Sequence, residues 1–168
     1  MSAVPAVTPM GGRSAARLAA VQALYQIELS AAPYDMVVAE FLKHRLGREI
    51  DGVSYGPADV KLFAEIVAGC VTRRDEIDGL INARLSKDRR LERLEAILRA
   101  LLRAATYELL ARPDVPARTA INEYLDIAHA FFGGPEPGFV NGVLDGVAHD
   151  LRATEFENAS HGHNGPRR

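Results

Sequence analysis

The stretch that decides the fold is residues 90–111, RLERLEAILRALLRAATYELLA. Its apolar side chains recur every three or four positions, which places them along one face of a helix. This stripe consists of Leu91, Leu94, Leu98, Leu101, Leu102, Ala105 and Leu109, and Pro113 follows shortly after it. The spacing therefore predicts one long amphipathic helix over 90–111 that packs one face against a core.

Six further segments show helical patterns, and none shows convincing strand alternation. We expect helices over about 14–30, 34–47, 57–72, 74–86, 116–132 and 138–152, with Ser14 as an N-cap and Pro57 in a first turn. The sequence thus predicts an all-α protein of about seven helices. Gly142 and Gly146 lie four apart on the last helix. Because glycine costs about 1 kcal/mol there relative to alanine, we expect another backbone to pack closely against them.

Length and composition indicate one globular domain. The chain has 168 residues, of which 48% are hydrophobic and 25% charged, which excludes a mostly disordered or collagen-like protein. Cys70 is the single cysteine, so no internal disulfide is possible and a reducing compartment is expected. Neither a signal-peptide pattern nor an apolar run of membrane-spanning length is present, and the expected location is the cytoplasm.

Motifs for reaction chemistry are missing from the sequence. It contains no glycine-rich nucleotide-binding fingerprint, no HExxH and no CxxC. The nearest approach to a di-iron motif is Glu40 with His44, whose spacing of four differs from the required three. We therefore expect no cofactor, no metal site and no catalytic residues, and a binding module rather than an enzyme.

Basic residues are unevenly placed although the net charge is only −2. Residues 84–103 hold seven bases and three acids, whereas residues 121–157 hold seven acids and one base. Arg99 and Arg103 share a helix face, as do Arg13 and Arg17, and Tyr25 follows the latter pair. Cations with aromatic side chains are typical of single-stranded RNA sites. Spacing alone leaves two alternatives open: Arg99 could pair with Glu95, and Tyr25 could belong to the core.

Three segments in order resemble the NusB family of bacterial transcription antitermination factors. The first is RLAAVQALY (17–25), the second is LRAATYEL (102–109) followed by DVP (114–116), and the third is AINE (120–123) continuing to FVNGVLD (139–145). The resemblance covers about 13–152. It implies two packed three-helix groups plus an additional helix. It also implies binding to the boxA element of nascent ribosomal RNA together with NusE, a small-subunit ribosomal protein, in a complex on RNA polymerase that suppresses premature termination.

The resemblance also implies site residues. The expected RNA-binding set is Arg13, Arg17, Gln22, Tyr25, Arg99, Arg103, Phe139 and Asn141. Phe139 is expected at the start of the last helix, where free backbone N–H groups favour phosphate. Asn122 and Glu123 are expected to be structural, with Glu123 accepting backbone N–H bonds or pairing with an arginine of helix 90–111. We expect the NusE surface in the region of helices 74–86 and 90–111.

The expected organisation is a flexible arm over 1–12, a NusB-like helical RNA-binding domain over 13–153 and a disordered tail over 154–168. Two alternatives to an RNA adaptor remain. One is a helical interaction module or homodimer without productive RNA binding. The other is a stand-alone relative of the N-terminal domain of an rRNA cytosine methyltransferase.

Overall fold

The computed structural model describes residues 12–44, 49–50, 53–54 and 57–157. These residues form seven α-helices, one short 3₁₀ helix and two very short strands. In chain order they are α1 (Gly12–Ser30), α2 (Tyr34–His44), β1 (Glu49–Ile50), β2 (Val53–Ser54), α3 (Pro57–Thr72), α4 (Arg74–Asn82), η1 (Leu91–Arg93), α5 (Ala96–Ala111), α6 (Ala117–Phe131) and α7 (Glu136–Leu151).

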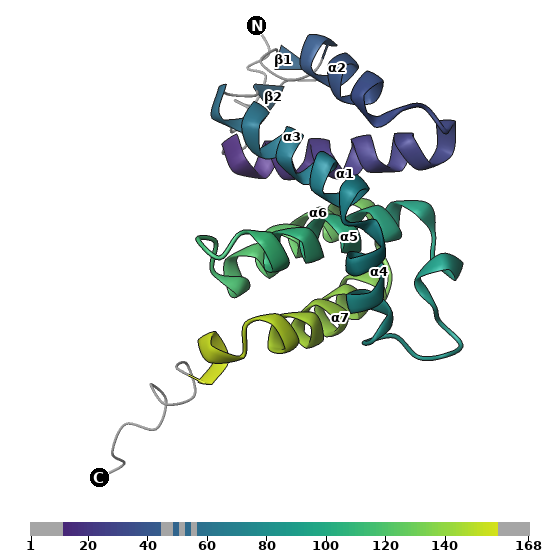
Figure 1. The fold of residues 1–168 in the computed structure, drawn as a ribbon, viewed down its shortest axis with the longest axis vertical. Coiled ribbons are helices and arrows are strands. Elements are labelled where there is room, and N and C mark those ends of the chain that lie inside the picture. The colour runs from purple at the N-terminus through teal and green to yellow at the C-terminus, as the bar shows by residue number, and fades with distance from the viewer. Residues whose placement is uncertain (1–11, 45–48, 51–52, 55–56, 158–168) are drawn as a thin grey trace, which may run out of the picture.

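The helices form two groups stacked on one another (Figure 1). The first group contains α1, α2 and α3, and the second contains α4 to α7. Helix α5 contacts both groups because it packs against α1 and α3 as well as α4, α6 and α7. The predicted all-α fold of two packed helical bundles is confirmed.

Small side chains on α1 let its neighbours approach closely. Alanine occupies five of its buried positions: Ala15, Ala16, Ala19, Ala20 and Ala23. Across from them, Phe63 of α3 is fully buried and stacks on Phe41 of α2 with 5.5 Å between ring centroids. The first group is therefore held by aromatic packing on one side of α3 and by close helix contact on the other.

The helix predicted over 90–111 is wrong at its N-terminal end. Leu91 and Leu94 are buried as predicted, but they belong to η1 and the residue after it, and α5 begins only at Ala96. The break lies at Leu94 and Glu95, whose ψ angles of 159° and 144° are extended. Apolar spacing could not reveal this break, because Leu91 before it and Leu94 within it are both buried in the core.

Between α2 and α3, β1 and β2 pair antiparallel, with Glu49 opposite Ser54 and Ile50 opposite Val53. The expectation of no strand is therefore wrong for this hairpin. The helix predicted over 34–47 is described only to His44, and 45–47 lie outside the described residues. Ser14 lies inside α1 and is not an N-cap, because its hydroxyl donates to Glu123 over 2.7 Å.

Arg152, which follows α7, closes the C-terminal end of α5. Its guanidinium donates to the carbonyl oxygens of Glu108, Leu109, Arg112 and Val115 over 2.6–3.1 Å. The last carbonyls of a helix have no partner within the helix, so a buried arginine here satisfies groups that would otherwise cost free energy.

The folded domain continues beyond Arg152. Residues 153–157 form a further helical turn, in which Glu155 accepts a hydrogen bond from the backbone N–H of Ala117 and Phe156 stacks on His149 at 3.9 Å. The predicted disordered tail over 154–168 is thus wrong for 154–157, and 158–168 lie outside the described residues. Of the predicted arm, residues 1–11 also lie outside them, whereas Gly12 begins α1.

Candidate nucleic-acid interface

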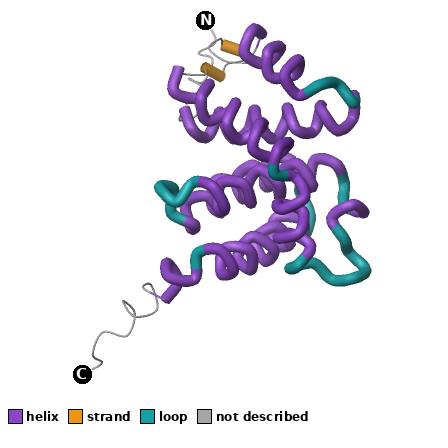
Figure 2. Tube along the Cα trace, in the orientation of Figure 1, coloured by secondary structure: helices purple, strands orange, loops and turns teal. Residues whose placement is uncertain are grey.

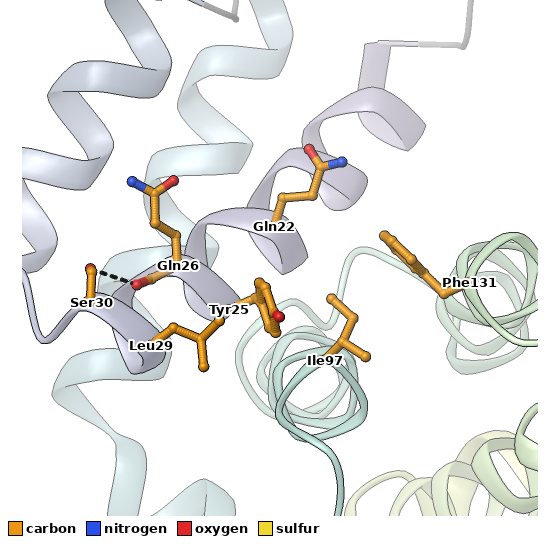
Figure 3. A pocket seen from close by; sticks show the side chains of 7 residues that line it. All are labelled: Gln22, Tyr25, Gln26, Leu29, Ser30, Ile97 and Phe131. Carbon is orange, nitrogen blue, oxygen red and sulfur yellow. Dashed lines mark hydrogen bonds between the residues drawn. The ribbon is translucent and has the colours of Figure 1, made fainter.

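An open groove of about 620 Å³ lies where α1 meets the starts and ends of helices from the second group (Figure 3). Helix α1 contributes most of its wall, α5 contributes one side chain near its start and α6 contributes its last residue. The lining side chains are Gln22, Tyr25, Gln26, Leu29, Ser30, Ile97 and Phe131. Two of the predicted RNA-binding residues, Gln22 and Tyr25, therefore lie in one groove.

The chemistry of this groove suits flat, polar-edged groups. Tyr25 is 37% exposed and Phe131 is 42% exposed, so both rings are accessible at its surface. Gln22 and Gln26 also line the groove, and their amides can donate and accept hydrogen bonds; none of the lining residues is charged. Unstacked bases bind in this way, by stacking on aromatic rings and hydrogen bonding along their edges. The alternative that Tyr25 is a core residue is wrong.

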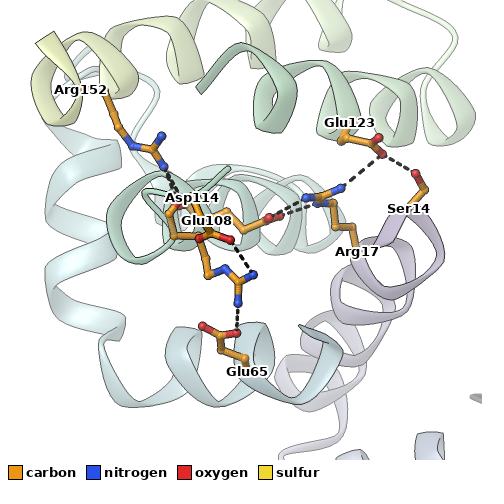
Figure 4. Close-up of polar contacts among 8 residues, drawn as sticks. Ser14, Arg17, Glu65, Glu108, Asp114, Glu123 and Arg152 are labelled. Carbon is orange, nitrogen blue, oxygen red and sulfur yellow. Dashed lines mark hydrogen bonds and ion pairs between the residues drawn. The ribbon is translucent and has the colours of Figure 1, made fainter. Parts of the chain in front are cut away.

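Arg17 lies in a buried ion-pair network instead of at the surface (Figure 4). Its side chain is 3% exposed, and its Nε and one terminal nitrogen donate to the two carboxylate oxygens of Glu108 over 2.8 and 2.9 Å. Glu123 lies 3.7 Å from the other terminal nitrogen and also accepts from Ser14. This arrangement joins α1, α5 and α6.

The electrostatics of this network keep Arg17 charged. Burial lowers the pKa of its guanidinium, but the hydrogen bonds and charge of Glu108 outweigh burial and raise the pKa above its ordinary value. Because the guanidinium is both buried and paired, the geometry argues against direct contact between Arg17 and RNA. Glu123 has a structural contact as predicted, although its partners come from α1 and not from helix 90–111.

Arg99 and Arg103 lie in a second ion-pair network between α1, α4 and α5. Arg103 donates to both carboxylate oxygens of Asp78 over 2.8 and 3.0 Å, and Arg99 pairs with Glu28. Their side chains are only 15% and 12% exposed, respectively, and Arg103 faces a hollow separate from the groove. The alternative pairing of Arg99 with Glu95 is absent from the contacts of these described residues.

Phe139 lies in the first turns of α7, but its backbone does not offer a free donor. Helix α7 begins at Glu136, three residues before Phe139, and the N–H of Phe139 donates to the carbonyl oxygen of Pro135 over 3.1 Å. Phe139 therefore lies one position beyond the free N–H groups of the first turn, and its own N–H is not one of them. The Phe139 ring is partly buried, and the guanidinium carbon of Arg89 lies 4.2 Å from its centroid.

The remaining predicted residues divide between surface and packing positions. Arg13, Asn122 and Asn141 are exposed. A Cβ on Gly142 would meet nothing within 4 Å, and one on Gly146 would meet the side chain of Arg84, not a backbone. The expectation that another backbone packs against these two glycines is therefore wrong.

Residues that the sequence analysis did not single out complete both features. Gln26 and Phe131 line the groove, and Glu108 anchors the buried network. The sequence contains one signal for the network. In the run AARLAAV (15–21), Arg17 is the single charged residue among apolar ones. Nothing local in the sequence pointed to Glu108 as its partner.

The described residues offer neither a metal-binding cluster nor a membrane-spanning helix. Within the part of the chain that the structure describes, no group of three or more His, Cys, Asp or Glu side chains is placed to hold a metal ion. Among the described helices, none is long and apolar enough to cross a membrane.

Fold and groove together define a small, mainly helical protein with an open groove that contains accessible aromatic rings. The model of the NusB family matches residues 14–149. The transcription antitermination protein NusB of Novosphingobium aromaticivorans is 54% identical over 140 residues, which cover 83% of this chain and 95% of that protein. Its counterpart from Caulobacter vibrioides is 52% identical over 140 residues, covering 83% and 94%. This chain belongs to the NusB family.

Solved structures agree with this assignment. NusB of T. maritima matches with a TM-score of 0.74 and 30% identity, covering 88% of this chain and 98% of that one. A crystal structure of the antitermination factors NusB and NusE in complex with dsRNA matches with a TM-score of 0.70 and 24% identity, covering 84% and 98%. The second match is evidence for the fold alone.

Proposed function

We propose that this chain is a transcription antitermination factor. In this proposal it binds the boxA element of nascent ribosomal RNA together with NusE and helps RNA polymerase read through terminators in rRNA operons. The observation that carries the proposal is identity above 50% with relatives named as transcription antitermination proteins, across almost their whole length. The cytoplasm is the location that this function requires.

The mechanism is joint binding without a covalent reaction. RNA held in the groove and NusE held on a neighbouring surface raise each other's effective concentration at the polymerase, so the assembly is tighter than either contact alone. The chain therefore acts as an adaptor and not as an enzyme. The relatives are matched over 94–95% of their length, which leaves little room for a methyltransferase domain in them.

In this proposal the predicted RNA residues have different roles. Gln22 and Tyr25 would contact bases, which their place in the groove supports, and Arg13, Phe139 and Asn141 are exposed or partly exposed positions for further contacts. Arg17, Arg99 and Arg103 act indirectly, because their guanidinium groups hold helices together through Glu108, Glu28 and Asp78.

The test is a titration of the protein into fluorescent single-stranded boxA RNA, beside a scrambled RNA of equal length, with and without NusE. We expect preference for boxA, tighter binding with NusE and weaker binding at higher salt. Tyr25→Ala should weaken binding by about 1–3 kcal/mol through the loss of one stacking surface. Lys61→Ala, which changes an exposed residue on α3, is the control for nonspecific effects.

The competing proposal is a homodimer without productive RNA binding. It has one observation in its favour, because Leu29 at the groove is 61% exposed and Phe131 is 42% exposed, as in a surface that meets another protein. Light scattering on the titrated sample separates the two. A dimer that ignores boxA even with NusE present would contradict the RNA adaptor.

A further inference from the structure

The loop between α4 and α5 carries a group of exposed cations that the predicted RNA-binding set does not include. Lys87, Arg89, Arg90 and Arg93 are all exposed, and they lie within seven residues that also contain Asp88 and Glu92. We call these four side chains the basic loop. Figure 2 shows the connection in teal, interrupted by the purple turn of η1, as it extends from the helical body.

Among the described residues, the cations of this loop differ from most others because they have no carboxylate partner. Ion pairs are formed by Arg17, Arg73, Arg74, Arg84, Arg99, Arg103, Arg112 and Arg152. The basic loop forms none within 4.0 Å in the same part of the chain. Its positive charge is therefore available to an anionic partner.

The loop is also fixed in place, which lowers the entropy cost of using it for binding. At its beginning, Arg84 forms an ion pair with Asp150 of α7. At its end, the backbone N–H of Leu91 donates to the side chain of Asn82 over 3.0 Å, and Leu91 is only 2% exposed. The cations therefore project from an anchored segment.

Arg89 adds a feature that a purely electrostatic patch would lack. Its guanidinium carbon lies 4.2 Å from the centroid of the Phe139 ring, so one ring face is already covered. A guanidinium is planar and stacks on aromatic faces, including those of bases. Arg89 and Phe139 together therefore form a composite flat surface that combines a positive charge with aromatic area.

The basic loop continues from the groove along the chain. Ile97 of the groove comes four residues after Arg93, and Phe131 of the groove ends α6 just before the turn that leads to Phe139. The loop is therefore adjacent in sequence to a groove residue, and it lies on the side of the molecule where α5 and α7 begin (Figure 1).

We propose that the basic loop and Phe139 form a second RNA contact that extends the groove. One base stacks on the Arg89–Phe139 pair, and Lys87, Arg90 and Arg93 contact the phosphates beside it. This inference rests on the proposed function, since it assumes that the groove holds single-stranded RNA. The planar guanidinium of Arg89 favours RNA as the partner, because a base can stack on it. An acidic protein surface would use only the positive charge of the loop.

The test measures RNA affinity by fluorescence anisotropy over a salt series, with wild type and loop variants and with boxA RNA extended at both ends. The triple variant Lys87→Ala, Arg90→Ala and Arg93→Ala should have a slope of log affinity against log salt that is shallower by about 2. Each lost phosphate contact on single-stranded RNA accounts for about 0.7 of this change. Arg118→Ala, an exposed arginine at the other end of α6, should leave that slope unchanged.

Arg89 is tested separately for stacking. Arg89→Ala should weaken binding at least about fivefold, the lower end of what one base stack supplies. Arg89→Lys keeps the charge but loses the planar surface, so it should retain the salt slope and still lose affinity. Circular dichroism of each variant shows whether its helices are intact.

Each outcome assigns a different failure. Wild-type binding to boxA with unchanged affinity and salt slope in all loop variants would overturn this inference and leave the proposed function standing. Variants that keep RNA affinity but lose NusE affinity would also overturn it, because the loop would then contact protein. Failure of the wild type itself to bind boxA, with NusE present, would overturn both proposals.

Discussion

Replacing Arg17 with alanine tests whether this residue stabilises the fold through its buried ion pair or contacts RNA directly. The substitution leaves Glu108, which is 0% exposed, without the guanidinium that donates to it over 2.8 and 2.9 Å. Removing one partner of a buried ion pair costs about 3–5 kcal/mol, because the other charge stays buried and unpaired. Domains of this kind have about 5–15 kcal/mol of stability in total, so roughly a fifth or more is expected to be lost.

The assay is urea unfolding followed by far-UV circular dichroism, which suits a chain without tryptophan. Arg13→Ala is the matched control, since it removes the same side chain one helical turn earlier from an exposed position and should change stability by less than about 0.5 kcal/mol. Replacing the pair together, Arg17→Met with Glu108→Leu, should recover much of the loss.

The expectation for RNA affinity is equally specific. Under conditions where it is folded, the paired Arg17→Met and Glu108→Leu variant should bind boxA RNA nearly as well as wild type. The structural role of Arg17 would be refuted by two results together. Arg17→Ala would lose less than about 1 kcal/mol of stability, and the fully folded variant would lose much of its RNA affinity, as expected of a direct RNA contact.

Three further predictions concern packing and ionisation. Gly69→Ala should destabilise the protein by about 1–3 kcal/mol, because the new Cβ would lie 2.0 Å from the Tyr107 ring. Gly142→Ala should stabilise it by about 0.5–1 kcal/mol, because a Cβ there meets nothing within 4 Å. Equal effects of the two substitutions in thermal unfolding would contradict this. Burial raises the pKa of the Cys70 thiol, so it should not react with a disulfide reagent at pH 8 until the protein is unfolded; rapid native labelling would show that the site opens. Burial and a nearby carboxylate raise the pKa of Tyr107 from 10.0 to about 12, so folding favours the neutral phenol. The free energy of unfolding should therefore fall as pH rises from 10 to 12, with a smaller fall in Tyr107→Phe; identical pH profiles would refute this.

Helix positions could largely be predicted from the sequence because they depend on local periodicity. The expected helix over 57–72 matches α3 residue for residue, and 116–132 differs from α6 by one residue at each end. The failure before α5 is physical: extended backbone at Leu94 and Glu95 turns the chain without moving either leucine out of the core.

The candidate site was less predictable because its decisive contacts join distant parts of the chain. Arg17 and Glu108 are separated by 91 residues, so no local pattern identifies them as partners. The resemblance grouped Gln22 with Tyr25, and both line one groove, but it did not indicate which arginines lie in buried ion pairs. Arg89 is equally hidden, since its place over Phe139 depends on how its loop packs against α7.

The most direct test of the account is terminator read-through in a reconstituted transcription reaction. Two templates would be compared, one with boxA upstream of the terminator and one with the boxA sequence scrambled, each with RNA polymerase, its antitermination factors and NusE. Adding this chain should raise read-through on the boxA template only, and Tyr25→Ala should reduce that gain. Read-through that is the same with and without the chain on the boxA template would contradict the proposed function.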